Sequence, residues 1–378
     1  MDMRLGGRRQ RAGTVRNLSL CSGVGGLDRG LEEAGMTTVG FCEIDARCRS
    51  VLAHHWPGIP THNDITTFDG KAWHGRVDIV SGGTPCTDLS MAGRRAGLAG
   101  ERSSIFWDFC RVATDCAAPW VLWENVAGAL SSNRGEDFAS VLWGITGFRP
   151  AVPADGWRSM GVCVGPVRVA AWRMLDARGF GVAQRRRRVF VVAGPRGRCS
   201  LAVLADAESV SRDTAPGGKA RTAAAAEARG RPDIRRRDEY VGSLTAMDGW
   251  ERPDNAHAEA GWIVPVVSGA LTSRYAKGAS TDVADGHVIG FNRLQDPVAS
   301  TDLAPSLSSG GSVGVAGALG ARRLTPRECE RLMGWPDDWT RWCADGREVA
   351  DSHRYRMAGN GVVSPVAAWI GRRIMEAR

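Results

Sequence analysis

The sequence predicts an α/β protein with a mixed, mostly parallel β-sheet, helices on both faces, and a smaller irregular second domain. Three observations carry this prediction. Short apolar runs of strand character alternate with helical segments along most of the chain. The first such run, residues 17–20, leads into a glycine-rich turn and then a helix, which is the opening unit of a nucleotide-binding βαβ fold. Between about 195 and 320 the alternation gives way to basic, glycine-rich and serine-rich pieces.

The composition indicates an ordinary folded protein. Of 378 residues, 43% are hydrophobic and 24% are charged, which argues against global disorder. The net charge of +8 permits a polyanionic partner without proving one. We expect no membrane span, because there is no run of 18 apolar residues. Residues 1–16 are basic and lack the apolar centre of a secretory signal, so we interpret them as a tail.

The ten cysteines do not form a metal site or a disulfide framework. None occurs as C-x-x-C or at zinc-finger spacing, so we expect no metal. Scattered cysteines in a chain without a signal peptide are typical of reduced thiols in a cytosol.

The glycine turn at 21–26 does not match the dinucleotide fingerprint, because Asp28 stands where the third glycine should be. The next predicted strand, 38–44, ends in an acid. Glu43 follows Gly23 by twenty residues, the spacing at which a carboxylate can accept hydrogen bonds from ribose hydroxyls. An adenosyl ligand without a diphosphate fits such a turn, although a solvated loop acid is the alternative interpretation.

A second motif joins a buried strand to a cysteine. The apolar residues 77–80 lead through Gly82 and Gly83 to Pro85 and Cys86. Open α/β folds place their chemistry at the carboxyl ends of such strands. A buried, unreactive thiol is the commoner fate of a free cysteine, so the motif alone leaves both interpretations open. The basic, glycine-containing loop that follows is either a lid or a solvated surface loop.

Later segments supply more polar groups at element ends. We expect a core helix at 104–116, a buried strand at 120–126 that carries Glu124, and an amphipathic helix at 168–178. Four arginines, 185–188, precede a strand at 189–192. Strand geometry should turn alternate ones to one side, either Arg185 and Arg187 or Arg186 and Arg188, unless the run is merely solubilising.

The chain returns to regular structure near residue 323. Thr325 and Glu328 form a capping box with proline at the first helical position. We expect Ser364 to cap a last helix whose apolar face docks on the main sheet. In between, the segment 219–237 has seven basic and two acidic residues, which favours an irregular basic domain over a flexible linker without a specific role.

In chain order, these motifs resemble those of DNA cytosine-5 methyltransferases. Each motif alone is weak, but the ordered set from about residue 17 to 375 is very specific. The set comprises LCSGVGG at 20–26, Glu43, Asp64-Ile65, Pro85-Cys86, ENV at 124–126, Gln184-x-Arg186-x-Arg188, RLTPRE at 323–328 and GNG at 359–361.

The resemblance implies a Rossmann-like methyltransferase fold in four parts. After the tail at 1–16, the catalytic domain would occupy 17–194 and return at 321–378. The target-recognition domain of the family would correspond to 195–320.

The resemblance also implies a mechanism. Cys86 would add to C6 of a cytosine flipped out of the duplex, so that C5 can take the methyl group of S-adenosylmethionine. Glu124 would donate a proton at N3, and Arg186 and Arg188 would orient the cytosine O2 and brace the acid, with their roles unassigned.

The cofactor pocket follows by the same resemblance. Ser22, Gly23, Gly25 and Gly26 would surround the methionine moiety, and Glu43 would bind the ribose. The adenine would lie between Ile44, Ile65 and Ile105, with Asp64 on its amino group. The residues that would complete the pocket are Gly83, Pro85, Asn360 and Val362.

A few positions depart from the family pattern. Cys21 stands where a phenylalanine is common, which removes an aromatic contact to the adenosyl group. Thr87 and Leu89 replace the usual Gln and Phe after the Pro-Cys pair, and Gly361 replaces a frequent serine. None of these changes removes a reacting group.

The resemblance implies double-stranded DNA as the partner of a monomeric enzyme in the cytoplasm of a bacterium or a phage-infected cell. A cognate restriction endonuclease that acts on the same site is compatible with it. Two other functions stay open: an RNA cytosine methyltransferase and a catalytically silent DNA-binding relative. A nicotinamide oxidoreductase is disfavoured by the missing third glycine.

Overall fold

The computed structural model describes residues 14–85, 105–196, 200–205, 289–292, 313–317 and 320–378. The tail at 1–13, Cys86 and the loop after it, and most of 206–312 lie outside these ranges.

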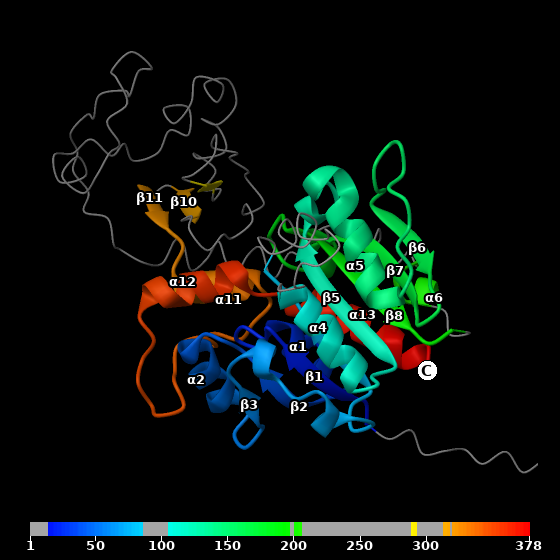
Figure 1. The fold of residues 1–378 in the computed structure, drawn as a ribbon. Helices are drawn as coiled ribbons and strands as arrows, with labels where there is room; N and C mark the ends of the chain where they lie inside the picture. Colours follow the sequence, from blue (N-terminus) through cyan, green and yellow to red (C-terminus); the bar gives the residue numbers. More distant parts are fainter. Residues whose placement is uncertain (1–13, 86–104, 197–199, 206–288, 293–312, 318–319) are drawn as a thin grey trace, which may run out of the picture.

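An eight-stranded sheet forms the centre of the molecule, in the order β3-β2-β1-β4-β5-β8-β7-β6 (Figure 1). Neighbours from β3 to β5 are parallel, whereas β8 is antiparallel to both β5 and β7, and β6 is antiparallel to β7. All strands except β8 and β6 therefore run in one direction, as the predicted mostly parallel sheet requires. The strands are β1 (Arg16–Leu20), β2 (Thr37–Cys42), β3 (Thr61–His62), β4 (Ile79–Gly82), β5 (Trp120–Val126), β6 (Met160–Val164), β7 (Val169–Asp176) and β8 (Arg187–Gly194).

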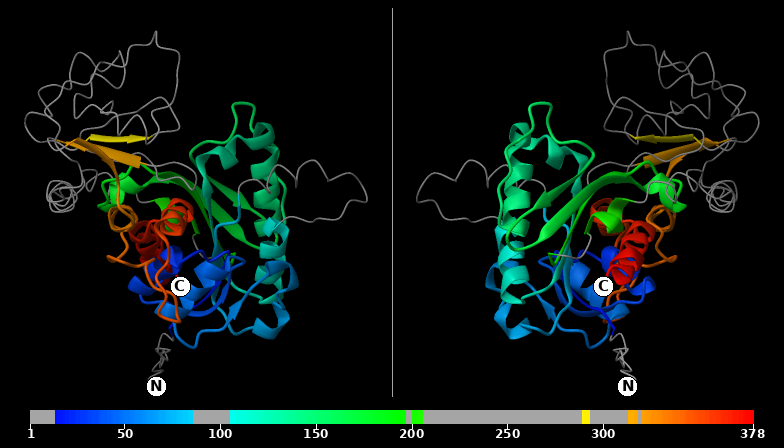
Figure 2. Two further views of the ribbon diagram at one scale, coloured as in Figure 1. Left: turned by 90° about the vertical axis from the view of Figure 1, so that its left-hand side faces the viewer. Right: turned by 90° about the vertical axis from the view of Figure 1, so that its right-hand side faces the viewer.

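Helices cover both faces of this sheet (Figure 2). On one face lie α4 (Ile105–Asp115) and α5 (Glu136–Thr146), whose Phe106, Phe109 and Phe138 are fully buried. On the other lie α1 (Gly26–Glu33), α6 (Ser200–Ala205) and α13 (Ser364–Glu376). The remaining elements are α2 (Ala46–His55), α11 (Pro326–Leu332), α12 (Asp351–Asn360), and the 3₁₀ turns η1 (Ile65–Thr67), η2 (Lys71–Trp73), η4 (Ala127–Leu130), η5 (Ser132–Gly135) and η6 (Ala177–Phe180).

A smaller antiparallel sheet has the order β11-β10-β9. Its strands are β9 (Ile289–Asn292), β10 (Val313–Gly317) and β11 (Gly320–Arg323). These strands and α6 are the described elements that lie within, or at the end of, residues 195–320, the segment expected to recognise DNA. Of α6, Val203 and Leu204 are buried in the core of the main sheet.

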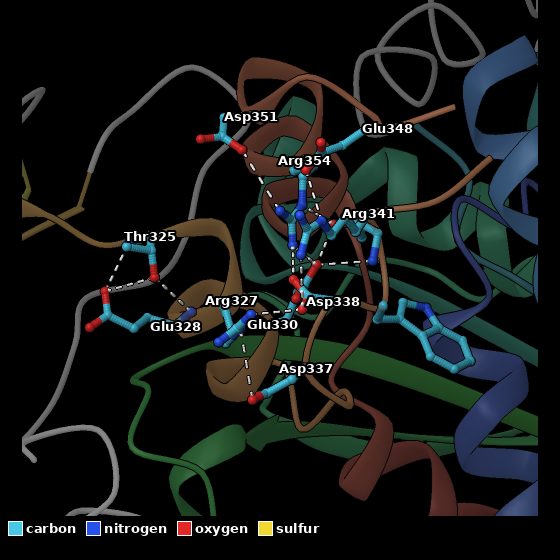
Figure 3. A network of polar contacts seen from close by, with 12 residues as sticks. Thr325, Arg327, Glu328, Glu330, Asp337, Asp338, Arg341, Glu348, Asp351 and Arg354 are labelled. Atoms are coloured by element: carbon cyan, nitrogen blue, oxygen red, sulfur yellow. Dashed lines mark hydrogen bonds and ion pairs between the residues drawn. The ribbon is translucent and has the colours of Figure 1, made fainter. Parts of the chain in front are cut away.

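Buried ion pairs hold α11 and α12 together (Figure 3). Arg354 of α12 is 6% exposed, and its Nη2 donates to Glu330 Oε1 at 3.0 Å and to Asp338 Oδ1 at 3.2 Å. The predicted capping box starts α11, since the Thr325 hydroxyl accepts from the Glu328 N–H and the Glu328 carboxylate accepts from the Thr325 N–H. The ion pairs of Arg354 therefore fix the position of α12, whose last turn borders the pocket described below.

Two predictions about local structure are wrong. Residues 168–178 form strand β7 and a 3₁₀ turn, not a helix, because β7 pairs with β6 and β8 and is packed on both faces, so no strand alternation appears in its sequence. Ser364 does not cap the last helix. Val363 occupies the N-cap position, and the Ser364 hydroxyl instead donates to the carbonyl of Gly26, which ties α13 to the start of α1.

Candidate active site

A pocket opens where β1, β4 and β5 end and where the turn between α12 and α13 passes over them. This is the carboxyl edge of the parallel strands, where α/β folds bind ligands. The residues that line the pocket are Ser19, Cys21, Ser22, Gly23, Gly26, Leu27, Gly82, Gly83, Glu124, Asn360, Gly361 and Val362.

The glycine turn after β1 needs its glycines for two different reasons. Gly23 and Gly25 have φ of 56° and 78°, in the left-handed region that favours glycine. Gly26 is required for close packing, because a Cβ there would lie 2.6 Å from the Val362 carbonyl oxygen. Ser22 stabilises the turn by donating from its hydroxyl to the carbonyls of Ser19 and Cys42 at 3.1 and 3.3 Å.

Glu43 lies beside this turn. One carboxylate oxygen accepts from the Gly23 N–H at 2.7 Å and the other from the Asp45 N–H at 2.8 Å. Burial raises the pKa of Glu43, against the lowering effect of these backbone hydrogen bonds. Ile44 is 74% exposed, and Arg49 holds its loop by donating to the carbonyls of Glu43 and Ile44 at 3.0 and 2.7 Å. The loop thus presents an apolar side chain to solvent next to a buried, fixed acid.

Like Glu43 and Ile44, the other residues expected around the adenine lie outside the pocket lining. The Asp64 carboxylate accepts from the N–H and hydroxyl of Thr66 and so caps η1. Ile65 is 6% exposed and belongs to the core. Ile105 begins α4 and is half-buried. Their contacts with a cofactor stay predictions, as do those of Pro85 and Gly25, which are also absent from the lining.

Strand β5 fastens the segment that leads to Cys86. The Asn125 side-chain amide donates to the Thr84 carbonyl at 2.8 Å, and the Trp123 indole N–H donates to the Thr84 hydroxyl at 3.0 Å. A Cβ on Gly83 would lie 2.9 Å from Glu124 Oε2, so only glycine lets the chain pass this close to the acid. Cys86 itself lies outside the described residues, but the path to it runs directly past Glu124.

Glu124 is an isolated acid in a basic environment. It is 8% exposed, and burial raises its pKa, while the charges of Arg188 and Arg186 act to lower it. Arg188 Nε lies 3.3 Å from Glu124 Oε1. Burial therefore favours the protonated acid, and the arginine stabilises the carboxylate that remains after a proton is donated.

The four arginines divide as strand geometry requires, and the structure selects the even-numbered pair. Arg186 is 3% exposed and Arg188 is partly buried, whereas Arg185 and Arg187 are exposed. Arg186 Nη2 donates to the carbonyls of Gly359 and Gly361 at 3.0 and 2.7 Å. Burial lowers the pKa of Arg186 to about 9, so it stays charged at neutral pH.

Asp28 has a role that its sequence position did not reveal. It is fully buried, and its oxygens accept from the Asn17 amide and the Ser19 hydroxyl, both at 2.9 Å. Ser81 of β4 joins this network by donating to Asn17 Oδ1 at 2.8 Å. Burial raises the pKa of Asp28 to about 7. Polar residues at alternate positions 17 and 19 of a buried strand were the available signal for a partner on α1.

The described part of the chain has neither a candidate metal site nor a candidate membrane span. It holds no group of three or more His, Cys, Asp or Glu side chains that could bind a metal. Within the same ranges, no helix has the length and apolarity needed to cross a membrane.

A mostly parallel sheet with a glycine turn after β1, an acid held beside that turn after β2 and a second acid on β5 in the pocket is the arrangement expected of an α/β methyltransferase. The comparisons with known proteins agree. Residues 15–376 match the family described as C-5 cytosine-specific DNA methylase, and the chain belongs to this family. Enzymes of this family transfer a methyl group from S-adenosylmethionine to C5 of cytosine in DNA.

Relatives and solved structures extend this likeness over the whole chain. The chain is 30% identical to a protein of Escherichia phage P1 named DNA N-6-adenine-methyltransferase, over 95% of this chain but 61% of that protein. It is 26% identical to the Type II methyltransferase M2.BsuMI of Bacillus subtilis, over 96% of this chain and 76% of the relative. A DNA modification methyltransferase encoded within an Escherichia coli prophage has the same fold, with a TM-score of 0.56 at 19% identity, over 96% of this chain and 99% of that one.

Proposed function

We propose that this chain methylates C5 of a cytosine that it flips out of a specific duplex DNA sequence, through a covalent bond between Cys86 and C6. The observation that carries the proposal is the position of Glu124. This buried acid, paired with Arg188, lines the same pocket as the glycine turn and lies against the segment that leads to Cys86.

The pocket fits S-adenosylmethionine. Gly23 and Gly26 line it without side chains, as a ligand in contact with the backbone requires. Glu43 is fixed beside the turn for ribose hydroxyls, and the exposed Ile44 offers an apolar surface for a purine. When bound there, S-adenosylmethionine supplies an electrophilic methyl group.

Cys86 is the proposed nucleophile. Its thiolate adds to C6 of cytosine, the C5–C6 double bond opens, and C5 gains the electron pair with which it takes the methyl group. Loss of the C5 proton then expels the thiolate and restores the aromatic ring. Several described cysteines are unsuited to this role, since burial raises the pKa of Cys42, Cys116 and Cys329 to about 12.

Glu124 is the proposed acid. By donating a proton to N3 as the thiolate adds, it lets the ring accept the electron pair that attack on C6 releases. Its burial keeps the acid protonated to a higher pH than an exposed glutamate, and Arg188 stabilises the carboxylate that proton transfer leaves.

Duplex DNA is the proposed substrate. In a duplex, a thiolate cannot reach C6 of a stacked, paired cytosine. The base must therefore leave the stack. The likeness to a Type II methyltransferase supports a specific recognition sequence, which a cognate restriction endonuclease would share. We propose further that the enzyme is a monomer and that it acts in a cytoplasm. Size-exclusion chromatography with light scattering tests whether it is a monomer.

Covalent trapping tests this proposal. The full chain is incubated with S-adenosylmethionine and duplex DNA of mixed sequence containing 5-fluorocytosine, where fluorine blocks release of the thiolate. We expect an adduct that survives denaturing electrophoresis and that Cys86→Ala does not form. Parallel incubation with 5-fluorocytosine RNA tests the alternative substrate. Absence of an adduct on DNA would refute the proposal.

A further inference from the structure

Arg186 contacts the C-terminal segment of the chain as well as acting on Glu124 through its charge. It directly precedes β8, and its own carbonyl accepts from the Ala177 N–H at 2.9 Å, which fixes its backbone. Its guanidinium bonds to the carbonyls of Gly359 and Gly361, more than 170 residues further along the chain. Gln184, two residues earlier, points the same way, and its amide donates to the Leu332 carbonyl at 3.1 Å.

These carbonyls lie at the end of α12, where a cation has a specific effect. The last four carbonyls of a helix have no partner within the helix, and the helix dipole places negative charge there. Gly359 belongs to the last turn of α12, and Gly361 is the residue that follows the helix. The Arg186 guanidinium therefore satisfies one orphan carbonyl and complements the dipole from a buried position.

The turn that Arg186 holds is one wall of the pocket. Asn360, Gly361 and Val362 all line it, opposite the glycine turn. The wall is closely packed, since a Cβ on Gly361 would lie 2.4 Å from the Trp335 ring, and the Trp335 indole N–H donates to the Val362 carbonyl at 3.2 Å. A shift of this turn would change the shape of the side that faces the cofactor.

We propose that Arg186 is a positioning residue for S-adenosylmethionine binding: it fixes the 359–362 wall of the pocket through its hydrogen bonds to Gly359 and Gly361. The inference rests on the proposed function for the identity of the ligand. It adds a role in cofactor binding to an arginine whose charge also acts on Glu124.

The test compares Arg186→Met, Arg186→Lys and the exposed neighbour Arg185→Met in the full chain. Calorimetry measures binding of S-adenosylhomocysteine, and methylation kinetics at saturating DNA give KM for S-adenosylmethionine and kcat separately. We expect Arg186→Met to weaken binding and raise KM about 10- to 100-fold, the usual effect of losing hydrogen bonds from a charged donor. Its kcat at saturating cofactor should change by a smaller factor than KM, because the Arg188–Glu124 pair is kept. Arg186→Lys should restore part of the affinity, and Arg185→Met should bind like the wild type.

Unchanged affinity in Arg186→Met with a large fall in kcat would overturn the inference and place this arginine at the base. Should Arg186→Met fail to fold in circular dichroism, Arg186→Lys decides: about 2- to 10-fold weaker binding supports the inference, and wild-type binding overturns it. Binding of S-adenosylhomocysteine needs no DNA, so these results stand even if the wild type does not methylate DNA. Lack of methylation by the wild type would refute the proposed function alone.

Discussion

The parallel half of the sheet, β3 to β5, and the half with the reversed strand β8 bring different groups to one edge. In the parallel half, the candidate site residues come directly after the strands: the glycine turn after β1, Glu43 after β2 and Gly83 after β4. In the other half, the same edge receives the beginning of β8, because β8 is antiparallel to β5. Arg186 and Arg188 therefore contact residues of the pocket, Gly361 and Glu124, from the start of a strand.

The difference explains how one pocket can serve two ligands. Strand ends supply backbone N–H groups and small residues, which suit close contact with a cofactor. The reversed strand supplies long cationic side chains, which suit the buried acid Glu124 and, in the proposed function, the base that it protonates. Glu124 lies where the halves meet, since β5 pairs with β4 on one side and with β8 on the other. Substitutions in the two halves should thus have separable effects on cofactor binding and on turnover.

The largest expected effect is a loss of methyl transfer with no loss of cofactor affinity. Cys86→Ala removes the nucleophile, so we expect methyl transfer to fall on the order of 10⁴-fold or more. Binding of S-adenosylhomocysteine, measured by calorimetry, should match the wild type. Methylation at a normal rate by this variant would show that another group attacks C6.

Glu124→Gln tests the meeting point of the two halves. A general acid typically contributes 10²- to 10⁴-fold, so kcat should fall by about that factor, with a smaller effect on DNA affinity. The wild-type kcat should also decline as the pH rises through the raised pKa of Glu124, because the acid then loses its proton. A pH profile with the same alkaline decline in both proteins would remove Glu124 from the role of acid.

Gly26→Ala tests the cofactor half. The added Cβ would lie 2.6 Å from the Val362 carbonyl oxygen and 2.8 Å from the Trp335 ring, so the pocket must widen. Overpacking of this kind should weaken S-adenosylhomocysteine binding about 10- to 100-fold. Gly128→Ala is the matched control, because its Cβ meets no atom within 4 Å. Equal affinities in the two variants would contradict the close packing of this wall.

The last expected effect concerns stability beneath the pocket. The folded-state pKa of Asp28, about 7, lies above its ordinary 3.8, so stability is highest when the carboxyl is protonated in both states, declines as the pH rises from 3.8 to about 7, and then levels off. The total decline is on the order of 4 kcal/mol. Asp28→Asn should flatten this dependence in thermal unfolding between pH 5 and 8.5. Parallel pH curves for the two proteins would show that Asp28 does not titrate in the fold.

The sequence predicted the sheet, the glycine turn and the alternation of the arginines because each depends on local spacing, whereas the contact of Glu43 with a ribose stays a prediction. It predicted β7 wrongly because a strand packed on both faces has no polar side to reveal its period. The bond from Arg186 to Gly361 and the network of Asp28 join distant segments, so no local pattern contains them. Cys86 stays a prediction carried by the motif order and by the anchored Thr84 before it.

The base that receives the methyl group is the most direct test of the account. A plasmid from an unmethylated host is incubated with the full chain and S-adenosylmethionine, hydrolysed to nucleosides and measured by mass spectrometry. We predict 5-methylcytosine, formed by the wild type and absent with Cys86→Ala. Formation of N6-methyladenine without 5-methylcytosine, the activity that the name of the phage P1 relative states, would contradict the account.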